Sequence, residues 1–251
     1  MSKLHASAPS LAVIIPALNE EAAIPSVVNK LREQLRLDQD RILVVDNGST
    51  DATAERALAA GATVVAEPRR GYGRACWAGV MAAEGFDLLL FMDGDGADDA
   101  SALPRLIEPL VAQKAEIVAG VRISEQREAG SMTQLQVAGN QLVTAMIHLF
   151  TGHRVSDVGP LRAIRRAHLL ALGMAEMTYG WSTEITIKAL RSNYRYQEIS
   201  VATYARRGGT SKVSGQLLPS LRAGLRLITT VLKYSRWQPT EDVEARLASP
   251  D

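Results

Sequence analysis

The sequence predicts an α/β fold in which helices flank both faces of a mostly parallel β-sheet. Short apolar runs alternate with longer segments whose apolar residues recur at helical spacing. The apolar runs lack polar alternation, as expected for strands that are buried on both faces of a parallel sheet. Polar residues follow several of these runs directly, and ligands of such sheets bind beyond the carboxyl ends of the strands.

The first strand is expected at LAVIIP (11–16), and a helix is expected over 20–36. That helix carries one apolar stripe, made of Ile24, Val27, Val28, Leu31 and Leu35. Further strands are expected at 41–46, 62–67, 86–93 and 115–122, and helices at 47–61 (after a turn), 71–85 and 100–113. These segments would form the first half of the protein, at about 11–122.

After residue 125 the pattern changes. We expect a helix at 131–150, a loop and short strand at 155–166, a helix at 182–192 and a strand at 194–205. A basic, glycine-rich loop (206–215) precedes an amphipathic helix at 216–236. We therefore predict a single domain over 1–236, with a second half at about 123–236, and a polar tail at 237–251.

Charge and composition exclude several classes of protein. The net charge is +1, so no overall field favours nucleic acid. The only cysteine is Cys76, which rules out a disulfide scaffold, and the four histidines have no zinc spacing. No run approaches the ~20 apolar residues of a membrane-spanning helix, and no signal peptide is recognisable. The expected location is cytoplasmic, or at most at the inner surface of a membrane.

The stretch LLLFMDGDGADD (88–99) places a concentration of carboxylates at the end of a buried strand. Asp93 and Asp95 flank a glycine, and this spacing can aim both at one hard cation such as Mg²⁺ or Mn²⁺. A solvated turn is the alternative, and capping of the next helix is expected for Asp98 and Asp99. The stretch also resembles the nucleophile motif of haloacid-dehalogenase-like phosphohydrolases, in which Asp93 would attack phosphorus. Such enzymes need a later acidic motif to hold the metal, and this sequence lacks one.

The stretch VVDNGSTDATAE (44–55) contains a second carboxylate at a strand end. Asn47 and Gly48 suit a tight turn, and Asp51 suits the cap of the following helix. Neither role explains Asp46. Hydrogen bonds from Asp46 to a base or a ribose would explain it.

In this order and spacing, VIIPALNEE, VVDNGSTD and MDGDG resemble the motifs of family 2 glycosyltransferases with the GT-A fold. The resemblance covers residues 11 to about 215. The segments DVGPLRAIRR and RRGGTSKVSG are most similar to the dolichyl- or polyprenyl-phosphate mannose or glucose synthase branch. Ala97 departs from that branch, which often has glutamine there.

The resemblance implies a nucleotide-binding half at about 11–122, an acceptor half at about 123–236, and roles for individual residues. It implies a nucleotide pocket lined by Pro16, Asn19, Glu20 and Asp46, a metal and donor diphosphate held by Asp93 and Asp95, and phosphate contacts from Arg122, Arg206 and Lys212. An acidic residue near Glu184 deprotonates the acceptor hydroxyl in many members, although a phosphate acceptor arrives ionised and needs no base. Glu184 is therefore either a base or a residue that orients its neighbours.

Two basic segments are further candidates. PRRGYGRACWAGV (68–80) lacks the third glycine of a dinucleotide fingerprint, because Cys76 stands there, and suits a flexible loop with Arg70 or Arg74 near the diphosphate. Arg206, Arg207 and Lys212 surround two glycines, a composition that suits anion binding. Lys212 is also a catalytic candidate. A solvated basic loop is the alternative for both.

The helix over 216–236 has an apolar stripe (Leu218, Leu221, Leu225, Ile228 and Leu232) flanked by Arg222, Arg226, Lys233 and Arg236. It could lie on a membrane surface, pack on the protein's own core or meet a partner subunit.

The preferred function is metal-dependent, inverting transfer of a hexose from a nucleotide sugar, UDP-glucose or GDP-mannose, to a polyprenyl phosphate. The alternatives are a soluble enzyme with a small hydroxylated or phosphorylated acceptor and a silent nucleotide-sugar binder.

Overall fold

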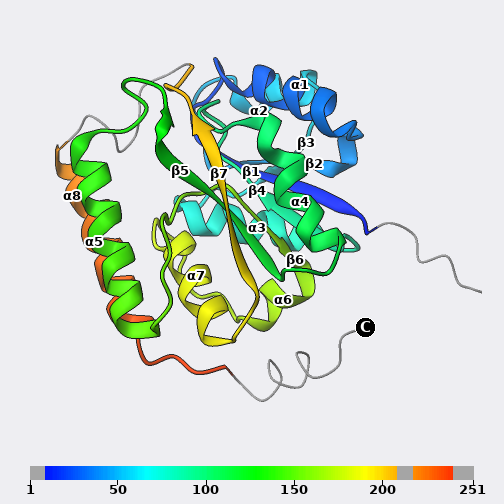
Figure 1. Cartoon of the computed structure of the whole chain (residues 1–251). Helices are drawn as coiled ribbons and strands as arrows, with labels where there is room; N and C mark the ends of the chain where they lie inside the picture. Colours follow the sequence, from blue (N-terminus) through cyan, green and yellow to red (C-terminus); the bar gives the residue numbers. More distant parts are fainter. Residues whose placement is uncertain (1–8, 208–216, 240–251) are drawn as a thin grey trace, which may run out of the picture.

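Seven strands form one sheet in the order β3-β2-β1-β4-β6-β5-β7 (Figure 1). The computed structural model describes residues 9–207 and 217–239. The strands are β1 (Leu11–Ala17), β2 (Ile42–Asp46), β3 (Thr63–Ala66), β4 (Leu88–Phe91), β5 (Ile117–Arg127), β6 (Arg162–Arg165) and β7 (Tyr196–Thr203). β6 is antiparallel to its neighbours β4 and β5, whereas the other pairs are parallel. The predicted α/β class with a mostly parallel sheet is confirmed.

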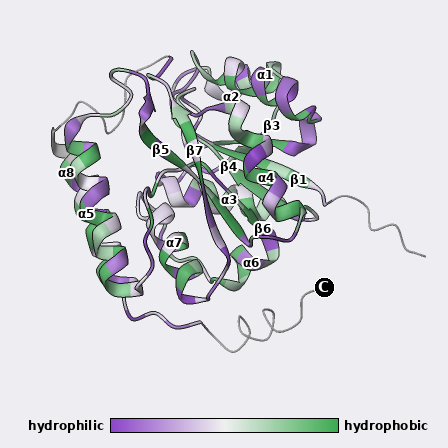
Figure 2. Cartoon of the chain, viewed as in Figure 1, coloured by the Kyte–Doolittle hydropathy of each residue, from purple (hydrophilic) through white to green (hydrophobic). Residues whose placement is uncertain are grey.

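Helices cover both faces of the sheet. They are α1 (Ile24–Leu35), α2 (Thr53–Ala59), α3 (Tyr72–Ala82), α4 (Leu103–Val111), α5 (Gln134–Thr151), α6 (Arg166–Ala171), α7 (Trp181–Arg191) and α8 (Leu217–Tyr234), with short 3-10 turns at Gln39–Arg41 and Ala100–Ala102. One core cluster joins the sheet to α1 and α4, and a second joins its other face to α3, α6 and α7. Figure 2 shows hydrophobic residues along the central strands β1 and β4, whereas β7 also carries hydrophilic residues.

The apolar runs at the centre of the sheet form strands that are buried on both faces, whereas the edge strand β3 is only partly buried. Every residue of β1 is buried, and so is every residue of β4. Burial of a Val, Leu or Ile side chain contributes about 1.5–3 kcal/mol relative to exposure, so these central strands dominate the stability of the core. Pairing of β1 with β2 and with β4 then places the carboxyl ends of all three strands at one edge.

Some boundaries differ from the prediction for local reasons. α1 begins at Ile24 instead of residue 20, because Pro25 occupies its first turn and residues 20–23 form a turn. A proline was predicted to interrupt the helix over 100–113, but Pro109 lies inside α4 and the helix continues past it. The six-residue α6 was not expected. The predicted helix over 216–236 corresponds to α8.

α5 and α8 lie side by side outside α7 and form a third core cluster with it (Figure 1). The cluster buries Val143 and Ile147 of α5 together with Val231 and Tyr234 of α8. A full capping box at Thr133 and Gln136 fixes the start of α5. Among the described residues, no helix has both the length and the apolar character that crossing a bilayer requires.

Candidate active site

The predicted convergence of Asn19, Asp46 and Asp93 follows from the register of the strands. Ala17 at the end of β1 pairs with Asp46 at the end of β2, and Ile14 of β1 pairs with Phe91 of β4. Asp46 is the last residue of β2, and Asn19 and Asp93 each lie two residues past the end of a strand, so all three are on one rim of the sheet. Pro16 is buried within β1, directly before this rim.

Two loops of the rim are interlocked around Asn19. Its backbone has a left-handed conformation, with φ of 51°, and its N–H donates to Ser49 Oγ at 2.9 Å. Its side-chain oxygen accepts from Thr50 N at 2.8 Å. Asp46 Oδ1 accepts from Ser49 N at 3.0 Å, which leaves Oδ2 of this partly exposed carboxylate for another donor. A ribose hydroxyl is a donor of the right kind.

Replacing Asp46 by Ala is expected to weaken binding of the free nucleoside diphosphate and of the nucleotide sugar by the same factor. A hydrogen bond to a charged group contributes about 1.5–3 kcal/mol, so the factor should be roughly ten to a hundred. Calorimetric titration with both ligands measures it. A variant that binds the nucleotide as tightly as the wild type would contradict a contact between Asp46 and the nucleotide, and the contact of Asp46 to Ser49 in the turn would then be its role.

Asn47 fastens the segment that precedes α3, a role that the sequence did not reveal. Its side-chain nitrogen donates to the carbonyl oxygens of Glu67 at 2.8 Å and Arg69 at 2.9 Å. Its side-chain oxygen accepts from Gly71 N at 2.8 Å. All three bonds are to backbone atoms, so the amide holds segment 67–71 against the end of β2.

The start of α3 is not the flexible loop that its glycines and arginines predicted. Gly73 N donates to Thr178 O at 3.2 Å, and a Cβ at Gly73 would come within 2.2 Å of Glu176 O. Only glycine permits this close approach. Arg74 N donates to Met177 O at 3.1 Å, while the Arg70 side chain is exposed near the turn after β2. The two arginines thus flank a packed segment.

Asp93 and Asp98 form a closely coupled pair beyond β4. Asp98 Oδ2 accepts from Asp93 N at 2.9 Å, so Asp98 is not a helix cap as predicted; Asp99 is, accepting from Ser101 N at 3.0 Å. Burial, together with repulsion from Asp95 and Asp98, raises the pKa of Asp93 well above its usual value. Burial raises the pKa of Asp98 to about 7. Asp93 Oδ1 is buried and has no hydrogen-bond partner.

The metal-free protein is expected to lose stability as the pH rises from about 4 to about 7. The folded pKa of Asp98, about 7, exceeds its ordinary value of 3.8. The folded state therefore holds the proton more tightly than the unfolded state, and this advantage is lost as the pH rises through the window. Carboxylates whose pKa is lowered by folding, such as Asp157, change the stability only at lower pH, where they become protonated.

Melting temperatures of the chelated protein at pH about 5 and about 8 measure this loss. In Asp98→Asn the difference should shrink, because the amide does not titrate and can still accept from Asp93 N. A melting temperature that rises from pH about 5 to about 8 in the wild type would contradict the prediction.

Arg206 lies three residues after the end of β7, and its side chain reaches the rim. Its Nη2 lies 3.2 Å from Asp95 Oδ2, and its Nη1 lies 2.7 Å from Glu20 Oε1. The guanidinium therefore bridges two carboxylates that are 75 positions apart in sequence and supplies a positive charge among the acidic groups. Arg207 stacks over the Tyr204 ring at 5.6 Å, and its N–H donates to Asp95 O at 3.2 Å. Lys212 lies outside the described residues.

The Arg122 guanidinium is held by a buried carboxylate. Its Nε and Nη2 each lie 2.7 Å from the carboxylate of Asp157, which is buried. This two-point ion pair lowers the pKa of Asp157, although burial opposes the shift. The phosphate role of Arg122 stays a prediction, and the ion pair with Asp157 fixes the position of its guanidinium.

Glu184 is a structural residue, and the alternative role of a base is not supported. It has no exposed surface, and its Oε1 lies 2.8 Å from Lys188 Nζ one helical turn later in α7. Its carboxylate also accepts from Ala175 N at 3.0 Å and from Glu176 N at 2.7 Å. A base must reach the hydroxyl that it deprotonates, and this carboxylate is enclosed by the core.

The acidic rim suits a hard divalent cation. Asp93 and Asp95 offer carboxylate oxygens, the ligands that such cations prefer, and the buried Asp93 Oδ1 lacks any partner. No cluster of three or more His, Cys, Asp or Glu side chains in metal-binding arrangement occurs within residues 9–207 and 217–239. Two protein ligands suffice for Mg²⁺, which usually retains waters and substrate phosphates.

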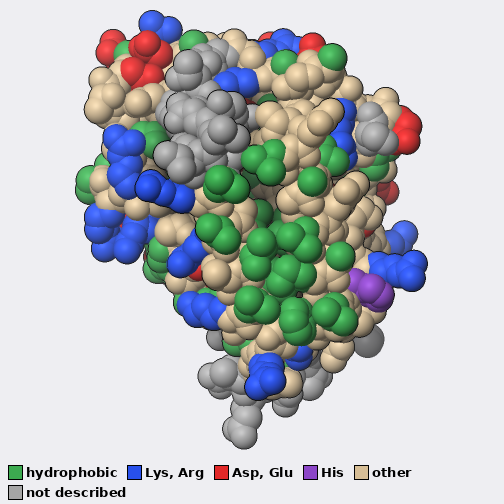
Figure 3. Space-filling model, turned by 90° about the vertical axis from the view of Figure 1, so that its left-hand side faces the viewer, with side chains coloured by type: hydrophobic (Ala, Val, Ile, Leu, Met, Phe, Trp, Pro, Cys, Tyr) green, Lys and Arg blue, Asp and Glu red, His purple; other side chains and the backbone are tan. Residues whose placement is uncertain are grey.

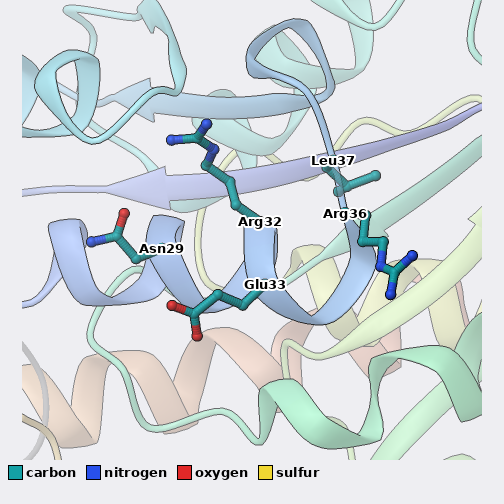
Figure 4. A pocket seen from close by; sticks show the side chains of 5 residues that line it. All are labelled: Asn29, Arg32, Glu33, Arg36 and Leu37. Carbon is teal, nitrogen blue, oxygen red and sulfur yellow. The ribbon is translucent and has the colours of Figure 1, made fainter.

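A surface hollow elsewhere on the chain has a different character. It is lined by Asn29, Arg32, Glu33, Arg36 and Leu37, at the end of α1 and just beyond it (Figure 4). α1 starts near the rim and runs back along the sheet, so this hollow lies toward the opposite edge. Arg32 already donates to Ala60 O at 3.3 Å. The hollow thus takes no part in the rim.

An open sheet with one antiparallel strand beside β4, and carboxylates beyond β1, β2 and β4, has the architecture of GT-A glycosyltransferases. The sequence profile of glycosyl transferase family 2 matches residues 12–173. The chain belongs to this family, as the resemblance of its motifs implied.

Three proteins illustrate the relationship. An uncharacterized glycosyltransferase of Mycobacterium tuberculosis is 39% identical over 216 residues, which cover 85% of this chain and 94% of the relative. A dolichyl-phosphate hexose transferase of Haloferax volcanii is 31% identical over 81% of this chain and 86% of its own length. The structure of glucosyl-3-phosphoglycerate synthase from Mycobacterium tuberculosis with Mn²⁺, UDP and glucosyl-3-phosphoglycerate superposes with a TM-score of 0.70, at 26% identity, over 93% of this chain and 82% of that one.

Proposed function

We propose that the chain transfers a hexose from a nucleotide sugar of the UDP-glucose or GDP-mannose type to a polyprenyl phosphate, in a single in-line displacement with inversion. The observation that carries the proposal is the rim itself, where Asp46 and Asp93 lie at the carboxyl ends of the two strands that flank β1 and Arg206 pairs with Asp95 at 3.2 Å. Residues 11–122 would bind the donor, and residues 123–236 would provide most of the acceptor side.

Asp93 and Asp95 would hold Mg²⁺ or Mn²⁺ together with the donor diphosphate. When bound, the cation neutralises charge on the leaving diphosphate. Arg206 adds a second positive charge beside Asp95, at 3.2 Å. The Mn²⁺ and UDP bound in glucosyl-3-phosphoglycerate synthase support a metal and a uridine nucleotide in this family.

A phosphate acceptor agrees with the enclosure of Glu184. A hydroxyl acceptor needs a base in the transition state, whereas a phosphate oxygen attacks in its ionised form. Glu184, the base candidate, is sealed in an ion pair with Lys188. The relative named as a dolichyl-phosphate hexose transferase supports a lipid phosphate as that acceptor.

A small phosphorylated acceptor is the second candidate. It is favoured by the likeness to glucosyl-3-phosphoglycerate synthase, whose structure covers 93% of this chain. Both candidates carry a phosphate, and cations near the rim would serve either.

Product mass spectrometry after incubation with a donor, Mn²⁺ and one acceptor tests the proposal. The acceptors are polyprenyl phosphate in detergent, the matching polyprenol without phosphate, and 3-phosphoglycerate. Glycosylated polyprenyl phosphate alone supports the lipid acceptor, and product from 3-phosphoglycerate alone supports the second candidate. Donor binding without turnover of any acceptor would leave a silent nucleotide-sugar binder.

Lys212→Ala is expected to lower transfer to polyprenyl phosphate much more than it lowers the slow hydrolysis of the donor by water. The acceptor brings a second anion close to the donor diphosphate, and a cation is needed where the two meet. Loss of a charge-assisted bond costs about 1.5–3 kcal/mol, or roughly ten- to a hundredfold in rate. The rates of transfer and of donor hydrolysis, measured for the variant and the wild type, check this prediction. Equal losses in both reactions would mean that Lys212 contacts the donor and not the acceptor.

A further inference from the structure

α5 carries an apolar stripe on the side that faces away from the protein. Leu135, Leu142 and Leu149 are 46%, 51% and 76% exposed, and Ala138 and Ala145 lie between them, also exposed. The alternating spacing of three and four residues aligns all five along one side of the helix. α5 contains no Asp, Glu, Lys or Arg. Such a side has none of the charges that normally solubilise a surface helix.

α8 extends this surface with a second stripe. Leu221, Leu225 and Leu232 are exposed, while Val231 and Tyr234 on its other side are buried against α5 and α7. The sequence had left open whether α8 packs on the core; it does so with one side only. We define the α5–α8 face as the exposed residues Leu135, Leu142, Leu149, Phe150, Leu221, Leu225 and Leu232. Figure 3 shows this side of the molecule, with hydrophobic side chains gathered at its centre.

Cations border the α5–α8 face. Arg222, Lys233 and Arg236 are exposed on or just after α8, and Arg154 is exposed just after α5. Neither α5 nor α8 contains an acidic residue. In Figure 3, Lys and Arg side chains surround the hydrophobic centre, and acidic side chains are few. The face therefore combines an apolar area with a positive margin.

We propose that the α5–α8 face docks on an anionic lipid bilayer. Leucines of an interfacial helix enter the boundary between headgroups and acyl chains, and the neighbouring cations meet the headgroups. A second copy of this chain would fit less well, because a shared two-fold interface would bring positive margins together. This inference concerns a surface outside the rim, and its test does not depend on the transfer reaction.

An ion pair connects the α5–α8 face to the active site. Arg226 of α8 lies 2.8 Å from Glu176, whose side chain is almost wholly buried. The segment that begins at Glu176 packs against Gly73 at the start of α3, and Tyr72 beside it lies near Asp93. A protein docked through α8 would therefore hold its active site at a fixed position relative to the bilayer surface.

Vesicle sedimentation without any nucleotide tests the proposal. The wild type should pellet with phosphatidylcholine vesicles that contain phosphatidylglycerol and stay in solution with pure phosphatidylcholine. Leu149→Glu and Leu225→Glu should each weaken binding about tenfold. Each variant removes one leucine that would enter the bilayer and adds a negative charge that the anionic headgroups repel. Leu58→Glu is the matched control, since Leu58 is 56% exposed on α2 and should leave binding unchanged.

Two results would overturn the proposal. One is a wild type that binds neither kind of vesicle. The other is a wild-type dimer in light scattering that Leu142→Glu converts to a monomer without any loss of vesicle binding, since a second copy would then cover the face. Transfer to polyprenyl phosphate in detergent should persist in the leucine variants, so failure of docking and failure of the proposed reaction give different outcomes.

Discussion

Asp95→Asn is expected to lower sugar transfer roughly a hundred- to a thousandfold while the protein stays folded. The amide removes one of the two charges that would hold the cation, and the leaving diphosphate then loses its neutralising partner. The fold should tolerate the change because Asp95 lies on a loop beyond β4 and its Oδ1 contact to Ala97 N can be kept by an amide oxygen. Initial rates with saturating donor and Mn²⁺ measure the effect.

Asp99→Asn provides the control for this prediction. It makes the same chemical change four positions later, on a carboxylate that caps the turn at Ala100–Ala102. Its rate should stay within a few-fold of the wild type. Treatment with a chelator should reproduce the loss in the wild type, and added Mg²⁺ or Mn²⁺ should restore the rate. Full turnover in the chelated wild type would end the assignment of Asp93 and Asp95 to a metal.

Glu184→Gln is expected to cost about 3–5 kcal/mol of folding free energy, the usual penalty for breaking a buried ion pair. Lys188 would keep its charge without its carboxylate partner, although it retains the carbonyl oxygens of Leu172 and Gly173 at 3.0 and 2.7 Å and the rings of Tyr234 and Trp237. Urea unfolding of the variant and the wild type measures the loss. Glu55→Gln, on an exposed residue of α2, should change stability little.

The same variant separates a structural residue from a base. At a temperature where Glu184→Gln is still folded, its rate should lie within about tenfold of the wild type, because the carboxylate does not reach the rim. The double variant Glu184→Gln/Lys188→Met should recover part of the lost stability, since the uncompensated charge is gone. A stable Glu184→Gln protein with a rate lowered a hundredfold or more would restore the role of base.

The positions of Asp46, Asp93 and Asp95 could be predicted because they depend on local pattern. Each follows an apolar run that is buried on both faces, and parallel strands place their carboxyl ends together. The partners of charged residues were not predictable in the same way. Arg206 and Glu20 are 186 positions apart, and Arg122 and Asp157 are 35 apart, so each contact is a product of the completed sheet.

Other errors had visible warnings in the sequence. Glu184 and Lys188 stand four positions apart, the spacing of an ion pair on one helix, within a segment of otherwise uncharged residues. The stripe of α5 recurs at three and four residues and could have been found beside that of α8. Asn47 gave no such warning, because its partners are backbone atoms of a segment that begins 20 residues later.

The position of β6 has a consequence for how the chain folds. β4 and β5 do not pair with each other, since β6 stands between them and hydrogen-bonds to both. Until residues 162–165 emerge from the ribosome, the edges of β4 and β5 that pair with β6 stay open in the nascent chain, and open edges are templates for aggregation. Closure of the sheet also depends on contacts between distant residues, which slows folding. Interruption of synthesis before β6 would therefore leave a fragment that is prone to self-association, whereas a chain that includes β6 can seal both edges at once.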